Sequence, residues 1–169
     1  MATLEKLEAK QTANTGYNKG FYESAKANEA NDKDIGLLAR MIYGEGAGED
    51  YNTMHVIGSS AINRLNANRP KEFGINLQDV LKKGYYAVRM QNDPYKQALS
   101  GKFNDDISKA KWDMANQVAR GLITGELPPL PAMFYFTDEE IEKLSKKNRF
   151  DFNQVKPTGA VGKYKTYTY

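Results

Sequence analysis

The spacing of apolar residues along the chain predicts a mainly helical protein. Before residue 44, Ile35, Leu38, Ala39 and Ile42 recur at i, i+3, i+4 and i+7, which is the spacing of one buried helix face. Similar stripes recur further along the chain, and Gly, Pro and capping residues indicate where they end. The predicted helices run over residues 34–44, 50–65, 76–84, 106–122 and 137–147.

Residues that begin or end helices support these bounds. Asp34 can cap the first helix with its carboxylate, and Asn76 can cap the short helix that Gly84 ends. Thr137, followed three residues later by Glu140, has the pattern of a capping box. Each signal is local, so it predicts a helix terminus without reference to the rest of the fold.

Aromatic and alternating segments predict the strands. Residues 85–88, Tyr-Tyr-Ala-Val, predict a short strand or turn, and residues 133–136 predict a strand. In the tail, residues 161–169, lysines alternate with tyrosine and threonine, which predicts a final strand. We therefore expect an α+β fold in a single domain, mainly helical with a small antiparallel sheet.

Residues 1–33 differ in composition from the rest of the chain. They are rich in Ala, Asn, Lys and Glu, with Leu4 and Leu7 as the only aliphatic anchors. Two interpretations stay open for this segment: a tether or docking arm, and a poorly ordered polar terminus. In both cases the main domain is expected to cover residues 34–169.

Composition excludes several classes of function. The 169 residues suit one domain, and 24 basic against 21 acidic residues, a net charge of +3, are too balanced for a nucleic-acid partner. No run of apolar residues is long enough to span a bilayer. Cysteine is absent and His55 is the only histidine, so we expect no metal site and no cofactor.

Glu45 is the strongest candidate for chemistry. It stands where the first predicted helix meets a turn containing Gly46 and Gly48, whose backbones can adopt angles closed to other residues. At the floor of a cleft, partial desolvation would raise its pKa and let it hold a proton near neutral pH. The alternative is a solvated glutamate, although a negative charge at a helix C-terminus opposes the helix dipole.

Five segments carry a resemblance to a known family. They are Leu-Leu-Ala-Arg at 37–40, Tyr-Gly-Glu at 43–45, Gly-Glu at 48–49, Asn-Arg at 63–64 and Pro-Ala-Met-Phe-Tyr-Phe at 131–136. In order and spacing, the chain from 34 to 169 resembles the SleB-like (spore-cortex lytic) cell wall hydrolases. The resemblance implies a lysozyme-like domain with a glycan-binding groove. It also implies that Glu45 is the catalytic acid/base of a lytic transglycosylase, which cuts peptidoglycan between N-acetylmuramic acid and N-acetylglucosamine.

Five further residues are candidates for substrate binding. Glu49 is either a second carboxylate of the site or a charge in the first turn of the next helix, where free amides favour it. Arg64 could pair with a carboxylate and Asn63 could bond backbone in the glycine turn, or they could be a surface charge and a helix-end amide. The resemblance favours support of the site. Tyr86 and Tyr135 are candidates for stacking on sugar rings, since aromatic faces complement apolar sugar faces.

Two other functions stay open. One is a hydrolytic muramidase, and the other is a non-catalytic phage structural or wall-binding protein, which Ala47 favours because the family has arginine there. The first residues lack the apolar core of a signal peptide. We therefore expect a phage-encoded member, in the virion or released from the host cytoplasm to the wall. Its expected partners are peptidoglycan and, through the N-terminal arm, other virion proteins.

Overall fold

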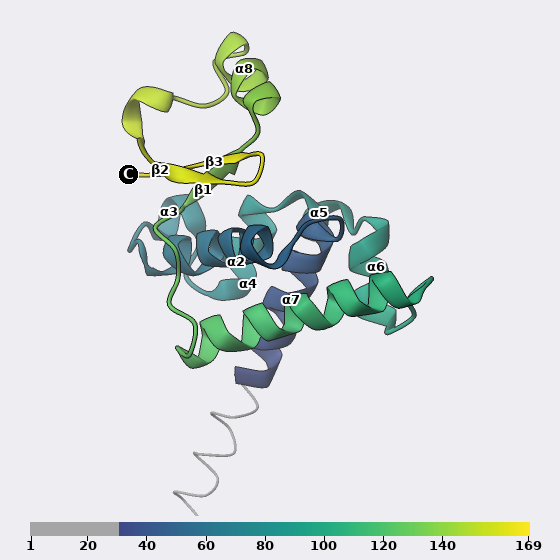
Figure 1. The fold of residues 1–169 in the computed structure, drawn as a ribbon. Helices are drawn as coiled ribbons and strands as arrows, with labels where there is room; N and C mark the ends of the chain where they lie inside the picture. The colour runs from purple at the N-terminus through teal and green to yellow at the C-terminus, as the bar shows by residue number, and fades with distance from the viewer. Residues whose placement is uncertain (1–30) are drawn as a thin grey trace, which may run out of the picture. The chain divides into compact units, whose positions relative to one another are not determined.

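Most of the described residues before β1, which begins at Phe134, are helical. The computed structural model describes residues 31–169, and the expected arm at 1–33 lies almost wholly outside them. Residues 31–46 are helical, so Asp34 lies inside this helix and does not cap it, and the helix passes Gly44. The helices that follow are α2 (Tyr51–Asn66), α3 (Pro70–Phe73), α4 (Leu77–Gly84), α5 (Tyr86–Met90), α6 (Asp93–Ser100), α7 (Asp106–Thr124) and α8 (Asp138–Lys146), with the 3-10 helix η1 (Phe152–Gln154) (Figure 1).

Side-chain caps explain several of these helix ends. The Asn76 side chain accepts a hydrogen bond from the backbone N–H of Asp79 at 2.9 Å, which confirms the predicted cap of α4. The capping box of Thr137 and Glu140 is also present at the start of α8. Each cap binds an amide in the first helical turn that has no partner within the helix.

The sheet has three antiparallel strands in the order β1-β3-β2. They are β1 (Phe134–Phe136), β2 (Lys156–Val161) and β3 (Tyr164–Thr168), and Tyr135 pairs with Thr166. The strand predicted at 133–136 is confirmed, and so is an α+β fold with a small antiparallel sheet. The single strand predicted at 161–169 is confirmed only for 164–168, because Val161 ends β2 and residues 162 and 163 form the turn between the two strands. β2 was not predicted, because Pro157 and Gly159 interrupt its pattern at a register shift.

The strand or turn predicted at 85–88 is wrong as a strand. Tyr85 is the residue between α4 and α5, and α5 begins at Tyr86. The Tyr85 side chain is buried, and its hydroxyl lies 2.6 Å from Oγ of Ser60. Tyr85 therefore packs in a core made by helices, and its aromatic side chain does not indicate a strand.

Helix α2 is central to the core. It packs against α7, α4 and β1, and in Figure 1 it lies between the sheet above and α7 below. A Cβ on Gly58 of α2 would come within 2.6 Å of Leu122 and 2.8 Å of Ile42, so glycine allows close packing at this point of the core.

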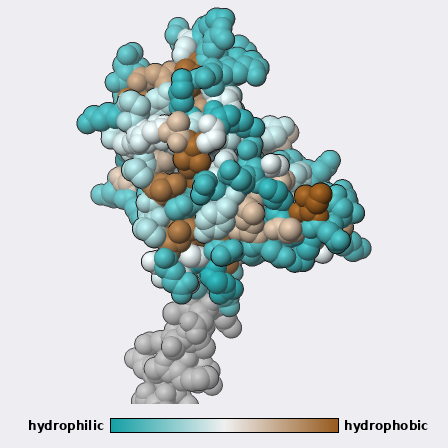
Figure 2. All heavy atoms as spheres, viewed as in Figure 1, coloured by the Kyte–Doolittle hydropathy of each residue, from teal (hydrophilic) through white to brown (hydrophobic). Residues whose placement is uncertain are grey.

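The visible surface is mainly hydrophilic, with isolated apolar residues (Figure 2). Single exposed apolar side chains are normal for a folded protein. Within residues 31–169, no helix combines the length and the hydropathy that a membrane crossing requires.

Candidate active site

Glu45 lies in the last turn of the helix 31–46 and is half-buried. Its Oε1 accepts a hydrogen bond of 2.7 Å from the backbone N–H of Ala87, in the first turn of α5. Burial raises the pKa of the Glu45 carboxyl, and the Ala87 N–H and the charges of Arg89 and Arg64 oppose that rise without cancelling it. The carboxyl therefore holds a proton to higher pH than an ordinary glutamate, as a general acid must.

Two of the glycines near Glu45 permit close packing. The prediction of unusual backbone angles at Gly46 and Gly48 is wrong. Neither residue has a positive φ. A Cβ on Gly44 would lie 2.6 Å from Cβ of Ala87, and one on Gly46 would lie 2.8 Å from Cδ1 of Ile57. Gly44 therefore lets α5 approach closely enough for the backbone N–H of Ala87 to reach the Glu45 carboxyl.

Tyr135 reaches the surroundings of Glu45 from β1. Burial, and after it the charge of Glu45, raises the pKa of the Tyr135 hydroxyl well above its usual range. The hydroxyl thus stays protonated and can donate a hydrogen bond. The Tyr135 ring meets the ring of Tyr164, on β3, edge to face at 5.6 Å.

Tyr86 lies at the surface beside the same carboxyl. It is the first residue of α5 and is 58% exposed, next to the Ala87 amide that binds Glu45. A ring in this position is accessible to a ligand. Stacking of Tyr86 or Tyr135 on sugar rings stays a prediction.

Asn63 holds the segment that leads into β1. Its Nδ2 donates to the carbonyl oxygens of Leu130 and Ala132, at 2.6 and 2.8 Å. The predicted bond to the glycine turn is therefore wrong, because the amide is used 67 and 69 residues further along the chain. Asn63 fixes the approach to β1, and so supports Tyr135 indirectly.

Arg64 bonds to backbone in the same segment. Its Nε donates to the carbonyl oxygen of Met133 at 2.8 Å, and its guanidinium lies 4.9 Å from the ring centroids of both Tyr85 and Phe134. The ion pair predicted with a carboxylate is absent from the described residues. Its link to the site is electrostatic, because its positive charge lowers the pKa of Glu45 against the effect of burial.

Glu49 is bound to the β2–β3 hairpin. The first-turn position predicted for it is wrong, because Asp50 caps α2 and the helix begins at Tyr51. Glu49 Oε1 lies 2.7 Å from Lys163 Nζ and accepts a hydrogen bond of 3.2 Å from the Tyr164 hydroxyl. The carboxylate is therefore already engaged by two groups of the protein.

No contact with Glu45 is found for His55 or for the cavity of the described residues. Nε2 of His55 is 3.0 Å from the carbonyl oxygen of Pro128, and residues 31–169 contain no group of three potential metal-ligating side chains. A cavity of about 520 Å³ lies between α8 and η1, and none of the predicted site residues lines it. Its lining residues are Ser145, Asn148, Phe150, Asp151, Phe152 and Asn153.

Sequence reasoning missed several groups, far along the chain, that act on Glu45 or pack on Tyr135. Ala87 contributes only a backbone N–H, which no side-chain motif reveals, and Arg89 and Tyr164 stood outside every recognised segment. For Tyr164, the predicted tail strand was a signal, because a strand that pairs with β1 must place some of its side chains next to Tyr135. Comparison with known protein families, with curated proteins and with solved structures gave no significant match.

Proposed function

We propose that residues 34–169 cleave peptidoglycan glycan strands as a lytic transglycosylase, between N-acetylmuramic acid and N-acetylglucosamine. The observation that carries the proposal is the Glu45 carboxyl, half-buried at a helix end with its pKa raised by burial. The family resemblance of the segments around it supports the same role. The proposal includes a lysozyme-like domain in which a glycan groove passes Glu45.

One carboxyl can perform both halves of this reaction. Protonated Glu45 donates its proton to the glycosidic oxygen as the bond from that oxygen to the anomeric carbon breaks. The carboxylate then takes the proton of the muramic acid C6 hydroxyl, whose oxygen bonds to the anomeric carbon and closes a 1,6-anhydro ring. Glu45 ends protonated, and no water is consumed.

The surroundings of Glu45 suit both protonation states. The Ala87 N–H holds Oε1 at 2.7 Å, which fixes the orientation of the carboxyl and leaves Oε2 to carry the proton. When the proton leaves, the charges of Arg64 and Arg89 stabilise the carboxylate. Neither arginine prevents protonation, because burial has the larger effect on the pKa.

The contacts of Glu49 favour one catalytic carboxyl over two. A retaining or inverting glycosidase needs a second carboxylate free to attack or to activate water. Glu49 instead pairs with Lys163 and accepts a hydrogen bond from Tyr164. An internal nucleophile removes the need for a second carboxylate, which supports the transglycosylase over the muramidase.

Product analysis tests the proposal. The full chain is incubated with purified peptidoglycan in heavy-oxygen water, and the released muropeptides are analysed by mass spectrometry. We expect ends of 1,6-anhydro-N-acetylmuramic acid, one water lighter than reducing ends and without label at the anomeric carbon. Intramolecular closure is expected to win because effective molarities of well-aligned groups reach about 10⁵ to 10⁸ M.

Each other product pattern contradicts the proposal in a distinct way. Labelled, reducing muramic acid as the main product would show a muramidase. Sedimentation of the protein with peptidoglycan, without any released muropeptide, would show a wall-binding protein. Glu126→Gln is the matched control for Glu45→Gln, because Glu126 is exposed and forms no ion pair in the described residues.

A further inference from the structure

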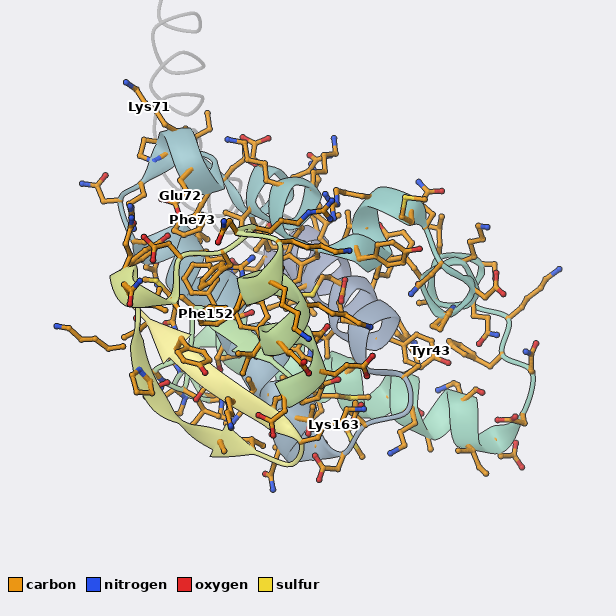
Figure 3. The ribbon with its side chains drawn as sticks, turned by 90° about the horizontal axis from the view of Figure 1, so that it is seen from above. Tyr43, Lys71, Glu72, Phe73, Phe152 and Lys163 are labelled. Atoms are coloured by element: carbon orange, nitrogen blue, oxygen red, sulfur yellow. The ribbon has the colours of Figure 1, made fainter. Side chains whose placement is uncertain are left out.

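The tip of the β2–β3 hairpin is tied to the segment that follows Glu45. Gly162 makes the turn with a φ of 56°, and Lys163 next to it points its Nζ at Glu49 Oε1, 2.7 Å away. Figure 3 shows Lys163 at this end of the hairpin. The Tyr164 hydroxyl donates to the same oxygen at 3.2 Å. Two consecutive hairpin residues thus converge on one carboxylate, four residues beyond Glu45.

The segment that carries Glu49 is also held from its other side. Lys111, on α7, donates from its Nζ to the backbone carbonyl oxygen of Glu49 at 2.6 Å. Asp50 next to it caps α2 through the backbone N–H of Thr53. Because the backbone of Glu49 is anchored to the helices, its side chain is a fixed point to which the hairpin attaches.

Two tyrosines, Tyr164 and Tyr135, connect the hairpin to the site of Glu45. Tyr164, held by Glu49, packs edge to face on Tyr135 with their ring centroids 5.6 Å apart. Tyr135 lies within the electrostatic influence of Glu45. Tyr135 also pairs with Thr166 of β3, so the position of its ring depends on where the hairpin lies.

The geometry points to Glu49 as a positioning residue for the site of Glu45: its ion pair with Lys163 fixes the hairpin, and the hairpin holds Tyr164 edge to face against Tyr135. Glu49 then acts without touching the substrate, which replaces its predicted role in substrate binding. The inference rests on the proposed function of Glu45. The inference goes beyond that function, because it assigns the β2–β3 hairpin the role of positioning Tyr164 and Tyr135.

The exposure of the pair suits positioning more than stability. The Lys163 side chain is 60% exposed and that of Glu49 is 23% exposed. Exposed ion pairs contribute little to the free energy of unfolding. Breaking the pair is therefore expected to displace the tip while the domain stays folded, and displacements of about 1 Å can lower a catalytic rate by up to 100-fold.

A charge exchange tests the inference. Glu49→Lys and Lys163→Glu are each expected to lower kcat roughly tenfold with little change in KM, within the range that misplacement produces. The double variant Glu49→Lys/Lys163→Glu restores an attractive pair and is expected to recover most of kcat. Amide hydrogen exchange at residues 163–165 should quicken in each single variant and return towards the wild-type rate in the double variant.

A second ion pair on the same hairpin provides the matched control. Lys165 pairs with Asp138 at 2.6 Å, with side chains 53% and 79% exposed. Lys165→Glu removes a similarly exposed pair that does not hold Glu49, so kcat is expected to stay at the wild-type value.

The outcomes separate the inference from the function on which it rests. A double variant that regains hairpin protection but stays as inactive as the single variants would overturn the inference, because the Glu49 carboxylate itself would then be needed. Single variants with unchanged exchange would overturn it too. If the wild-type protein releases no muropeptide, the proposed function fails, and the exchange rates still decide whether Glu49 ties down the hairpin.

Discussion

The two sides of strand β1 serve different purposes. Phe134 and Phe136 point to one side, where the Phe150 ring lies 5.0 Å from each, both edge to face. Tyr135 points to the other side, where its ring meets that of Tyr164. Alternation along a strand produces this division within three residues.

The two sides differ in what surrounds their rings, and the proposed reaction concerns only one of them. The phenylalanine side consists mainly of aromatic rings packed on one another, and it includes the Tyr167 ring and the Arg64 guanidinium, so its contribution is chiefly burial and ring packing. On the tyrosine side, burial and the charge of Glu45 raise the pKa of the Tyr135 hydroxyl. We therefore expect substitutions on the first side to change mainly the free energy of unfolding, and substitutions on the second to change mainly the rate.

The largest effect is expected at the carboxyl on the tyrosine side. Glu45→Gln keeps an oxygen to accept from the Ala87 N–H, but its amide neither donates an acidic proton nor accepts one. Loss of a general acid and base should lower muropeptide release by at least about 10²- to 10⁴-fold while the fold is retained. A variant that keeps more than a tenth of wild-type peptidoglycan clearing would remove Glu45 from the reaction.

On the phenylalanine side, Phe150→Ala is expected to lower stability and not the rate. Phe150 contacts Phe134, Phe136 and Phe152 but is only half-buried. The loss should therefore be about 2 kcal/mol, less than the roughly 3 to 5 kcal/mol of a fully buried phenylalanine. Urea unfolding measures the loss, and kcat of the folded variant should match the wild type. A large fall in kcat at full folding would show that the two sides are not independent.

A hydroxyl deletion on each side sharpens the comparison. Tyr135→Phe removes a hydroxyl whose pKa is raised by burial and by the charge of Glu45, and keeps the ring, so kcat should fall by up to about tenfold, the equivalent of one hydrogen bond of about 0.5 to 1.5 kcal/mol. Tyr167→Phe is the control, because Tyr167 contacts Phe136 and Phe152 on the opposite side. Equal effects of the two changes on kcat would contradict the division.

The smallest expected effect is a change in how stability depends on pH. Burial raises the pKa of Glu45 in the folded protein above its unfolded value of about 4.3. The folded state then binds the proton more tightly, so this contribution to stability is complete below the unfolded pKa and is lost as pH rises through the folded pKa. Urea unfolding should show Glu45→Gln gaining stability relative to the wild type between pH 4 and pH 7. A difference independent of pH would contradict the raised pKa.

Periodic segments and capping signals were predictable because their causes are local. The helix predicted at 50–65 is α2, Tyr51–Asn66, and the caps by Asn76 and by Thr137 with Glu140 occur as expected. Where local signals were ambiguous, tertiary packing determined the secondary structure. Tyr85 and its neighbours have the composition of a strand, yet Tyr85 is buried against Ser60 and lies between the helices α4 and α5.

The sequence by itself determined the helical stripes, their caps and the candidacy of Glu45, since each depends on residues within one or two turns. Only the tertiary structure decided what surrounds that carboxyl. Ala87, which binds Glu45, is 42 residues away, and Tyr164, which binds Glu49, is 115 residues away. Propensity and capping act along the chain, whereas contacts between distant segments arise when apolar faces pack. The same packing brought Asn63 and Arg64 to the approach of β1 and not to the glycine turn.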